Sequence, residues 1–210
     1  MPRRLPLPAT RFVHLVRHAE PAPDGSGLTA RGRGQAELLG ERLGRLPLTS
    51  LHHGPLPRAA ETARIVGERA GVRPEPAATA GDYVPHVPRR DELPPHLADF
   101  YLGFLADTPP EEAEAGRALA RRATDLYTGP AEGDTVRHDV VVTHNFLVAW
   151  LVREALHAPR WRWLGINHSH ASLTTIRHTP GRAPYLHVQN DMSHLTPESR
   201  WTDAPPEEHV

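Results

Sequence analysis

Short apolar runs alternate with helical segments along most of the chain, and this alternation restricts the fold more than any other feature. Residues 11–16 and 139–143 are runs of mainly apolar side chains, typical of strands buried on both faces. The segments between and after them carry apolar residues at helical spacing. This pattern predicts an α/β fold: a mainly parallel central sheet with helices on both faces, in a three-layer sandwich.

The same patterns predict the individual elements. Helices are expected over residues 28–46, 58–70, 97–106, 111–127 and 146–156. Thr29 is the expected N-cap of the first helix, and Gly71 should end the second. Further short strands are expected over residues 48–51, 172–176 and 185–188. The proline-rich stretch 74–95 predicts a long, partly irregular excursion.

The length and composition indicate one globular domain. The 210 residues contain no internal repeat and no domain-sized linker. We expect a single domain over residues 1–210, with an ordered core at about residues 11–195. The ends, residues 1–10 and 196–210, are rich in proline and polar residues and are expected to be loose tails.

Charge and cysteine content exclude several functions. The formal net charge is -1, so no broad binding surface for nucleic acid or an anionic membrane is expected. The absence of cysteine excludes disulfides, thiolate metal sites and cysteine nucleophiles. No apolar run has the length of a membrane span or a signal-peptide core, which predicts a cytoplasmic protein. The sequence does not indicate an oligomeric state.

Two histidines occupy equivalent positions, directly after a predicted strand and before a turn and a helix. His18 follows Arg17 at the end of the first strand, and His144 follows the strand 139–143. Ligands in parallel α/β sheets gather outside the carboxyl ends of the strands. The sequence therefore predicts that His18 and His144 share one site.

Four segments in order carry a resemblance to a known family. They are Leu-Val-Arg-His-Ala-Glu at residues 15–20, the helix start at 28–36, Pro-Leu-Pro-Arg-Ala-Ala-Glu-Thr-Ala at 55–63, and Val-Val-Thr-His-Asn at 141–145. Together they resemble the histidine phosphatase superfamily, also called phosphoglycerate-mutase-like, over residues 12 to about 156. The resemblance implies a metal-independent phosphatase without a cofactor, acting on a small phosphomonoester through a phosphohistidine on His18.

The residues suit that chemistry. The planar guanidinium groups of Arg17 and Arg58 can each donate paired hydrogen bonds to phosphate. His18 must attack as a neutral imidazole, and neighbouring guanidinium groups would lower its pKa. His144 is expected to bind and stabilise the transferring group. The family's general acid lies about two dozen residues past the second arginine, where Asp82 stands.

Some positions depart from the family pattern, and some roles stay open. Asp91 and Glu92 are alternatives to Asp82 as the acid. Asp24 stands where many members carry a phosphate-binding asparagine, and Gly54 where many carry serine. The rival functions are a phosphoglycerate mutase, an inactive binding domain of the same fold and a metal-dependent hydrolase.

Further histidines occur in two close pairs, His52-His53 and His168-Ser169-His170. Neither pair has zinc-enzyme spacing, so they are expected to be surface histidines or weak adventitious binders, and no metal site is expected. Substrate choice is expected to depend on residues 82–106, and the candidates there are Tyr83, Val84, His86, Val87 and Phe100.

Overall fold

The computed structural model describes residues 8–209, which are built around a six-stranded sheet. The strands are β1 (Arg11–Arg17), β2 (Ser50–His53), β3 (Pro74–Pro76), β4 (Arg137–Thr143), β5 (Leu173–His178) and β6 (Tyr185–Asp191). Their order is β3-β2-β4-β1-β5-β6. The first four strands in this order are parallel, and β5 and β6 pair antiparallel at one edge. The prediction of a mainly parallel sheet is confirmed.

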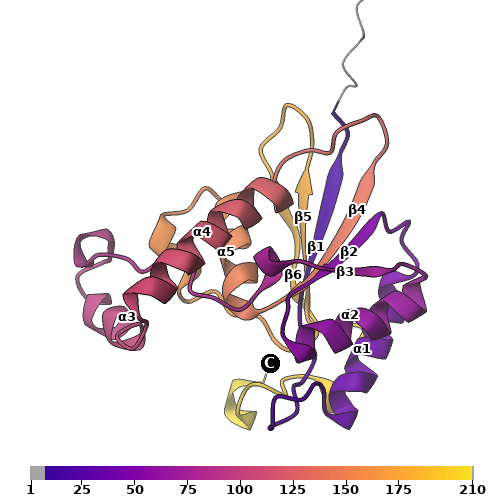
Figure 1. The fold of residues 1–210 in the computed structure, drawn as a ribbon, viewed down its shortest axis with the longest axis horizontal. Helices are drawn as coiled ribbons and strands as arrows, with labels where there is room; N and C mark the ends of the chain where they lie inside the picture. Colours follow the sequence, from indigo (N-terminus) through magenta and orange to yellow (C-terminus); the bar gives the residue numbers. More distant parts are fainter. Residues whose placement is uncertain (1–7, 210) are drawn as a thin grey trace, which may run out of the picture.

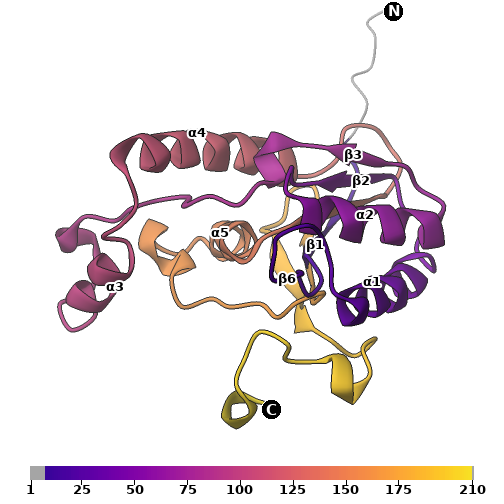
Figure 2. The ribbon, with the colours of Figure 1, turned by 60° about the horizontal axis from the view of Figure 1, so that its bottom comes forward.

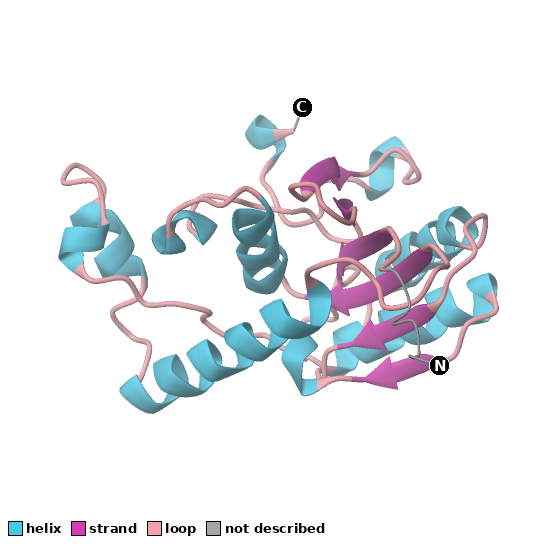
Figure 3. Ribbon diagram, turned by 90° about the horizontal axis from the view of Figure 1, so that it is seen from above, coloured by secondary structure: helices cyan, strands magenta, loops and turns pink. Residues whose placement is uncertain are grey.

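Helices cover both faces of this sheet. The helices of the described chain are α1 (Ala30–Leu43), α2 (Pro57–Ala70), α3 (Ala98–Phe104), α4 (Pro110–Tyr127) and α5 (Asn145–Ala155), and all but α3 lie against the sheet. Figures 1 and 2 show α1 and α2 on one side of the strands and α4 and α5 on the other. From above, the strands lie between these two groups, and α3 stands away from the sheet (Figure 3). The three-layer α/β architecture is thus the predicted one.

The central strands explain the two-faced core. Val13 and Leu15 of β1 pack with α5, whereas Val16 of the same strand packs with α1 and α2. All three side chains are fully buried, as are those of Val140 and Val142 in β4. Burial on both faces requires the nearly continuous apolar run from which these strands were predicted.

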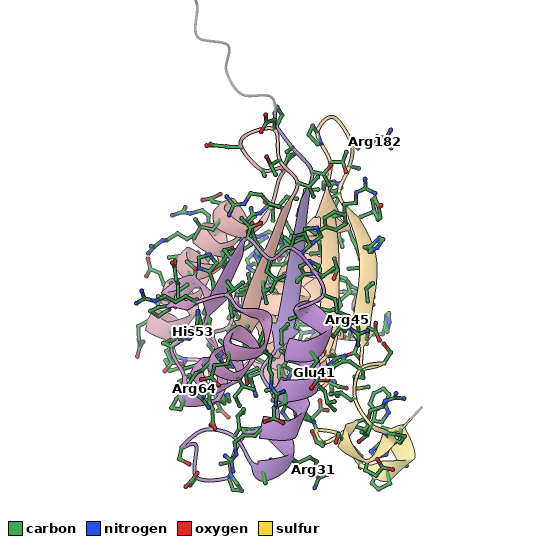
Figure 4. The ribbon with its side chains drawn as sticks, turned by 90° about the vertical axis from the view of Figure 1, so that its right-hand side faces the viewer. Arg31, Glu41, Arg45, His53, Arg64 and Arg182 are labelled. Atoms are coloured by element: carbon green, nitrogen blue, oxygen red, sulfur yellow. The ribbon has the colours of Figure 1, made fainter. Side chains whose placement is uncertain are left out.

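The two predicted helix caps are confirmed, although α1 ends at Leu43 and not at residue 46. The Thr29 side chain accepts a hydrogen bond from the Gly32 amide at the start of α1. Gly71 ends α2 in the left-handed conformation with φ 71°. The outer faces of both helices carry charged side chains, among them Arg31, Glu41 and Arg64 (Figure 4).

One strand was not predicted. β3 lies within the stretch expected to be irregular, because Pro74 and Pro76 argue against a strand interior. It pairs with β2 alone, at the edge of the sheet. An edge strand needs hydrogen-bond donors on one side only, so it tolerates proline. Within residues 8–209, no helix has the length and apolar character needed to cross a bilayer.

The predicted tails lie only partly within the described residues. Residues 1–7 and 210 lie outside the described residues, and Ala9 pairs with Ala131 through backbone hydrogen bonds. Residues 196–209, called here the C-terminal segment, contain two 3₁₀ turns and run beneath the carboxyl ends of the central strands (Figures 1 and 2). Gln35 of α1 donates to the Ser199 carbonyl at 2.7 Å. The polar residues of this segment therefore make internal hydrogen bonds.

Candidate active site

The ends of β1 and β4 place two histidine rings side by side. The His18 amide donates to the Thr143 carbonyl at 2.8 Å, which continues the pairing of the two strands by one residue. The ring centroids of His18 and His144 are 5.0 Å apart. His18 is 5% exposed and His144 1% exposed. The sequence prediction that parallel strands bring these two residues together agrees with this geometry.

The backbone fixes the orientation of the His18 ring. Its Nδ1 lies 2.8 Å from the Ala19 carbonyl oxygen, which can only accept, so Nδ1 carries the proton. Nε2 is therefore unprotonated and carries the lone pair of the ring. The Arg58 Nε–H points at that atom from 3.2 Å. The Ala19 amide in turn donates to Thr62 Oγ1 at 3.1 Å, which holds the turn after β1.

Burial keeps both rings neutral. It lowers the pKa of His18 to about 2, and the neighbouring His144, His170 and Arg17 act in the same direction. Burial likewise lowers the pKa of His144 to about 4. Neither ring nitrogen of His144 has a hydrogen-bond partner among residues 8–209. A neutral ring with free nitrogens can donate one N–H to an incoming anion.

Arg58 and Asp82 complete one side of the site. Pro57 opens α2, so Arg58 lies in its first turn. The Arg58 Nη2 donates to Asp82 Oδ2 at 2.7 Å, and the same oxygen lies 3.5 Å from His144 Nδ1. The Thr143 hydroxyl donates to the Ala80 carbonyl at 2.8 Å and ties the loop that carries Asp82 to the end of β4.

Arg17 closes the opposite side, with partners that sequence reasoning missed. Its Nη1 donates to the His168 carbonyl and to Asp203 Oδ2, each at 2.5 Å. Its Nη2 lies 3.2 Å from His170 Nε2, and the His170 ring is 5.3 Å from that of His18. Asp203 belongs to the C-terminal segment. No motif marked it, because only the folded chain brings it to Arg17.

The expectation that His168 and His170 are surface histidines is wrong. They are 0% and 7% exposed, and burial lowers the pKa of each to about 4. His168 packs beside Asn145, whose side-chain oxygen accepts from the His168 amide at 2.9 Å. A spacing of two residues is compatible with a turn that directs both side chains inward. Within residues 8–209, no group of three or more side chains is arranged to hold a metal ion.

The alternative acids have other partners. Asp91 is exposed and pairs with Arg89 at 3.1 Å, and Glu92 binds His86 Nε2 at 2.7 Å. Of the three carboxylates considered, Asp82 is the one that the structure brings to Arg58 and His144.

The two departures from the family pattern have local explanations. Asp24 is turned onto its own loop, where it accepts from the Ser26 amide at 3.0 Å and the Ser26 hydroxyl at 2.7 Å. A Cβ on Gly54 would lie 2.3 Å from the Ala80 carbonyl oxygen. The Asp82 loop thus packs directly on the Gly54 backbone, and no serine side chain fits there.

The predicted substrate-contacting residues are only partly brought together. The Tyr83 hydroxyl donates to the Thr79 carbonyl, and Val84 packs against the core. His86 is buried against Glu92, and Val87 is partly exposed. Phe100 is 71% exposed and lines a cavity of about 260 Å³ beside the start of α5. The other side chains of this aromatic cavity include Tyr101, Phe104, Asn145, Phe146 and Trp163.

Known proteins resemble this chain in sequence and in fold. The serine/threonine-protein phosphatase Pgam5, mitochondrial, of Caenorhabditis briggsae is 27% identical over 197 residues, which are 90% of this chain and 66% of that protein. The chain thus spans just under two thirds of the length of this relative. Mycobacterial hydrolase 1 superimposes with a TM-score of 0.65 at 23% identity, covering 87% of this chain and 99% of that one.

A second mycobacterial structure, glucosyl-3-phosphoglycerate phosphatase, superimposes with a TM-score of 0.60 at 22% identity, covering 86% of this chain and 99% of that one. At such identities the structures establish the fold. The sequence model of the histidine phosphatase superfamily (branch 1) matches residues 13–191, which is most of the chain. This protein therefore belongs to the histidine phosphatase superfamily.

Proposed function

We propose that this chain is a phosphatase that hydrolyses a small phosphomonoester through a phosphohistidine on His18. The observation that carries the proposal is the His18 ring itself. It is neutral, its Nδ1–H donates to the Ala19 carbonyl so that Nε2 is unprotonated, and Arg58 Nε lies 3.2 Å from Nε2. A neutral imidazole beside a cation suits attack on a phosphoryl group, whose charge the cation stabilises.

The reaction then has two balanced steps. In the first, the Nε2 lone pair forms a bond to phosphorus, and the bond from phosphorus to the alcohol oxygen breaks. Asp82, in its acid form, gives its proton to the leaving oxygen. In the second, water attacks phosphorus, Asp82 takes a proton from that water, and the P–Nε2 bond breaks to release phosphate. Arg17, Arg58 and one N–H of His144 hold the phosphoryl oxygens throughout.

The aromatic cavity supports an apolar or aromatic alcohol as the other part of the substrate. Its wall includes Asn145 and Phe146, the residues that directly follow His144. Phe146 packs edge-on against Trp163, with ring centroids 4.9 Å apart. An ester bound with its phosphate between His18 and His144 would extend its alcohol part toward these rings. A larger cavity of about 630 Å³ lies against α4 and α5 and is lined by none of the proposed catalytic residues.

A phosphate-release screen over alkyl, aryl, sugar and nucleoside monoesters tests the function. The wild-type protein should release phosphate from at least one ester between about pH 5.5 and 7.5, and aryl esters should be preferred. Added chelator should leave the rate unchanged, which a metal-dependent hydrolase would not allow. A mutase would instead interconvert phosphoglycerates with little net release. No release from any ester would refute the phosphatase proposal.

Asp82→Asn tests the acid. The amide cannot give a proton to the leaving oxygen, so kcat for alkyl esters should fall by about 10²–10³-fold. Nitrophenyl phosphate should lose much less, because its leaving oxygen needs no proton. Asp91→Asn is the matched control and should leave both rates unchanged. Equal losses for the two kinds of ester would show that Asp82 binds or positions groups but is not the acid.

Other properties of the chain stay predictions. The Caenorhabditis briggsae relative is named as mitochondrial and as a protein phosphatase. We propose a small-molecule ester and a cytoplasmic location for this chain, and both rest on its sequence. The complete set of Arg17, His18, Arg58 and His144 in one site supports an active enzyme over an inactive binding domain.

A further inference from the structure

Two hydrogen-bond acceptors hold Arg17 in the site, and both bind its Nη1. Both N–H groups of Nη1 are engaged, one by the His168 carbonyl and the other by the Asp203 carboxylate. Asp203 is itself buried, with its side chain 8% exposed. Burial lowers the pKa of Arg17, and the charge of Asp203 opposes that effect. A carboxylate from the C-terminal segment therefore compensates the charge of this largely buried guanidinium.

The other edge of the same guanidinium is still available. Nε is buried and has no hydrogen-bond partner among residues 8–209. Among residues 8–209, the two N–H groups of Nη2 have one partner, His170 Nε2 at 3.2 Å. The Nε–H and the Nη2–H lie on one edge of the planar group, in the spacing that binds two oxygens of a phosphate. An incoming phosphoryl group would satisfy the buried Nε–H, which is otherwise unpaired.

The C-terminal segment is anchored so that Asp203 stays in place. Arginine only donates, so His170 Nε2 accepts from Arg17 and its Nδ1 carries the proton. That Nδ1 lies 3.0 Å from the Thr202 hydroxyl oxygen. Gln35 of α1 also donates to the Thr202 hydroxyl at 3.3 Å and to the Ser199 carbonyl at 2.7 Å. His170 and Gln35 thus hold the side chain of Thr202, the residue before Asp203.

We propose that Asp203 is a positioning residue of the active site, which turns the Nε–Nη2 edge of Arg17 toward the phosphoryl group. The proposal rests on the proposed function, in which Arg17 binds that group. It makes the C-terminal segment part of the phosphate-binding site. Asp203 itself does not touch the substrate and acts only through Arg17.

The test is a double-mutant cycle between the two residues. Asp203→Asn keeps the size of the side chain but removes its charge, and it should raise KM and the inhibition constant of inorganic phosphate by about 10–100-fold, with a smaller change in kcat. Asp203→Glu, which keeps the carboxylate, should recover part of this loss. In an Arg17→Ala background, Asp203→Asn should have no further effect, because the residue that it orients is gone.

The matched control is Glu207→Gln, an exposed carboxylate of the same segment that should not change KM. Thermal unfolding of each variant identifies a loss that comes from misfolding. If Asp203→Asn does not fold, the wild-type protein still tests whether phosphate binds this edge of Arg17. On addition of inorganic phosphate, the ¹⁵N resonance of Arg17 Nε should shift.

Three results would overturn the proposal while phosphate release by the wild type still supports the proposed function. They are an unchanged KM in a folded Asp203→Asn, an effect of the same size in the Arg17→Ala background, and a lower KM in Asp203→Asn. The last would show that the carboxylate competes with phosphate. An unshifted Arg17 Nε resonance at saturating phosphate would also overturn the proposal.

Discussion

His18→Ala should lower the rate of phosphate release by roughly 10⁴- to 10⁶-fold, the range found when a covalent nucleophile is removed from an enzyme. The variant lacks the atom that forms the bond to phosphorus, and His144 does not replace it, because its ring centroid lies 5.0 Å from that of His18. The wild type, quenched during turnover, should contain an acid-labile phosphate on one histidine. The variant should contain none.

The control for this experiment is His187→Ala, which removes an exposed histidine on β6. It should leave the rate unchanged. His18→Ala should still bind inorganic phosphate, because Arg17, Arg58 and His144 remain, so binding separates loss of the nucleophile from collapse of the site. A His18→Ala protein that folds and turns over esters at the wild-type rate would rule out the phosphohistidine mechanism.

The parts of this site that could be predicted are those that strand order determines. Two buried strands with the same apolar character are neighbours in the sheet, and a histidine follows each of them directly. Parallel pairing then places the two rings together, whatever the rest of the chain does. Arg58 was indicated by the family resemblance of residues 55–63, a segment that opens the helix after β2.

The parts that could not be predicted depend on contacts between distant segments. Asp203 lies 186 residues after Arg17 in a polar, proline-rich stretch, which has the composition of a loose tail. His168 and His170 carry no apolar periodicity that would mark their side chains as buried. Their burial depends on the turn between α5 and β5 and on Thr202, which the sequence does not connect to them.

The buried histidines make the fold sensitive to acid. His14, His144, His168 and His170 are all less than 9% exposed, and burial lowers the pKa of each to about 4. The pKa of His18 is lowered further, to about 2. In the unfolded chain each ring would take up a proton at about pH 6.5. Between about pH 6.5 and pH 4 the unfolded chain therefore binds more protons than the folded one, and stability falls as the pH falls.

The expected loss is large. When the pH falls from about 7.5 to 5.5, each of these five rings lowers the free energy of unfolding by roughly 1 kcal/mol. Together they lower it by about 5 kcal/mol. A domain of this kind has about 5–15 kcal/mol of stability in total. Denaturant unfolding followed by tryptophan fluorescence should show the free energy of unfolding dropping steeply between pH 7 and 5.5. A free energy that stays constant over this range would contradict the prediction.

His14→Gln gives the sharpest form of the test, because His14 lies on β1 away from the phosphate site and bonds Thr175 and His138. Between pH 7.5 and pH 5.5, the free energy of unfolding of this variant should fall by about 1 kcal/mol less than that of the wild type. This difference does not depend on the stability of the variant at pH 7.5. His96→Gln, at an exposed position, is the control and should lose as much as the wild type. Since His18 stays neutral well below pH 5.5, activity at acid pH should then be limited by unfolding of the protein, and not by protonation of the nucleophile.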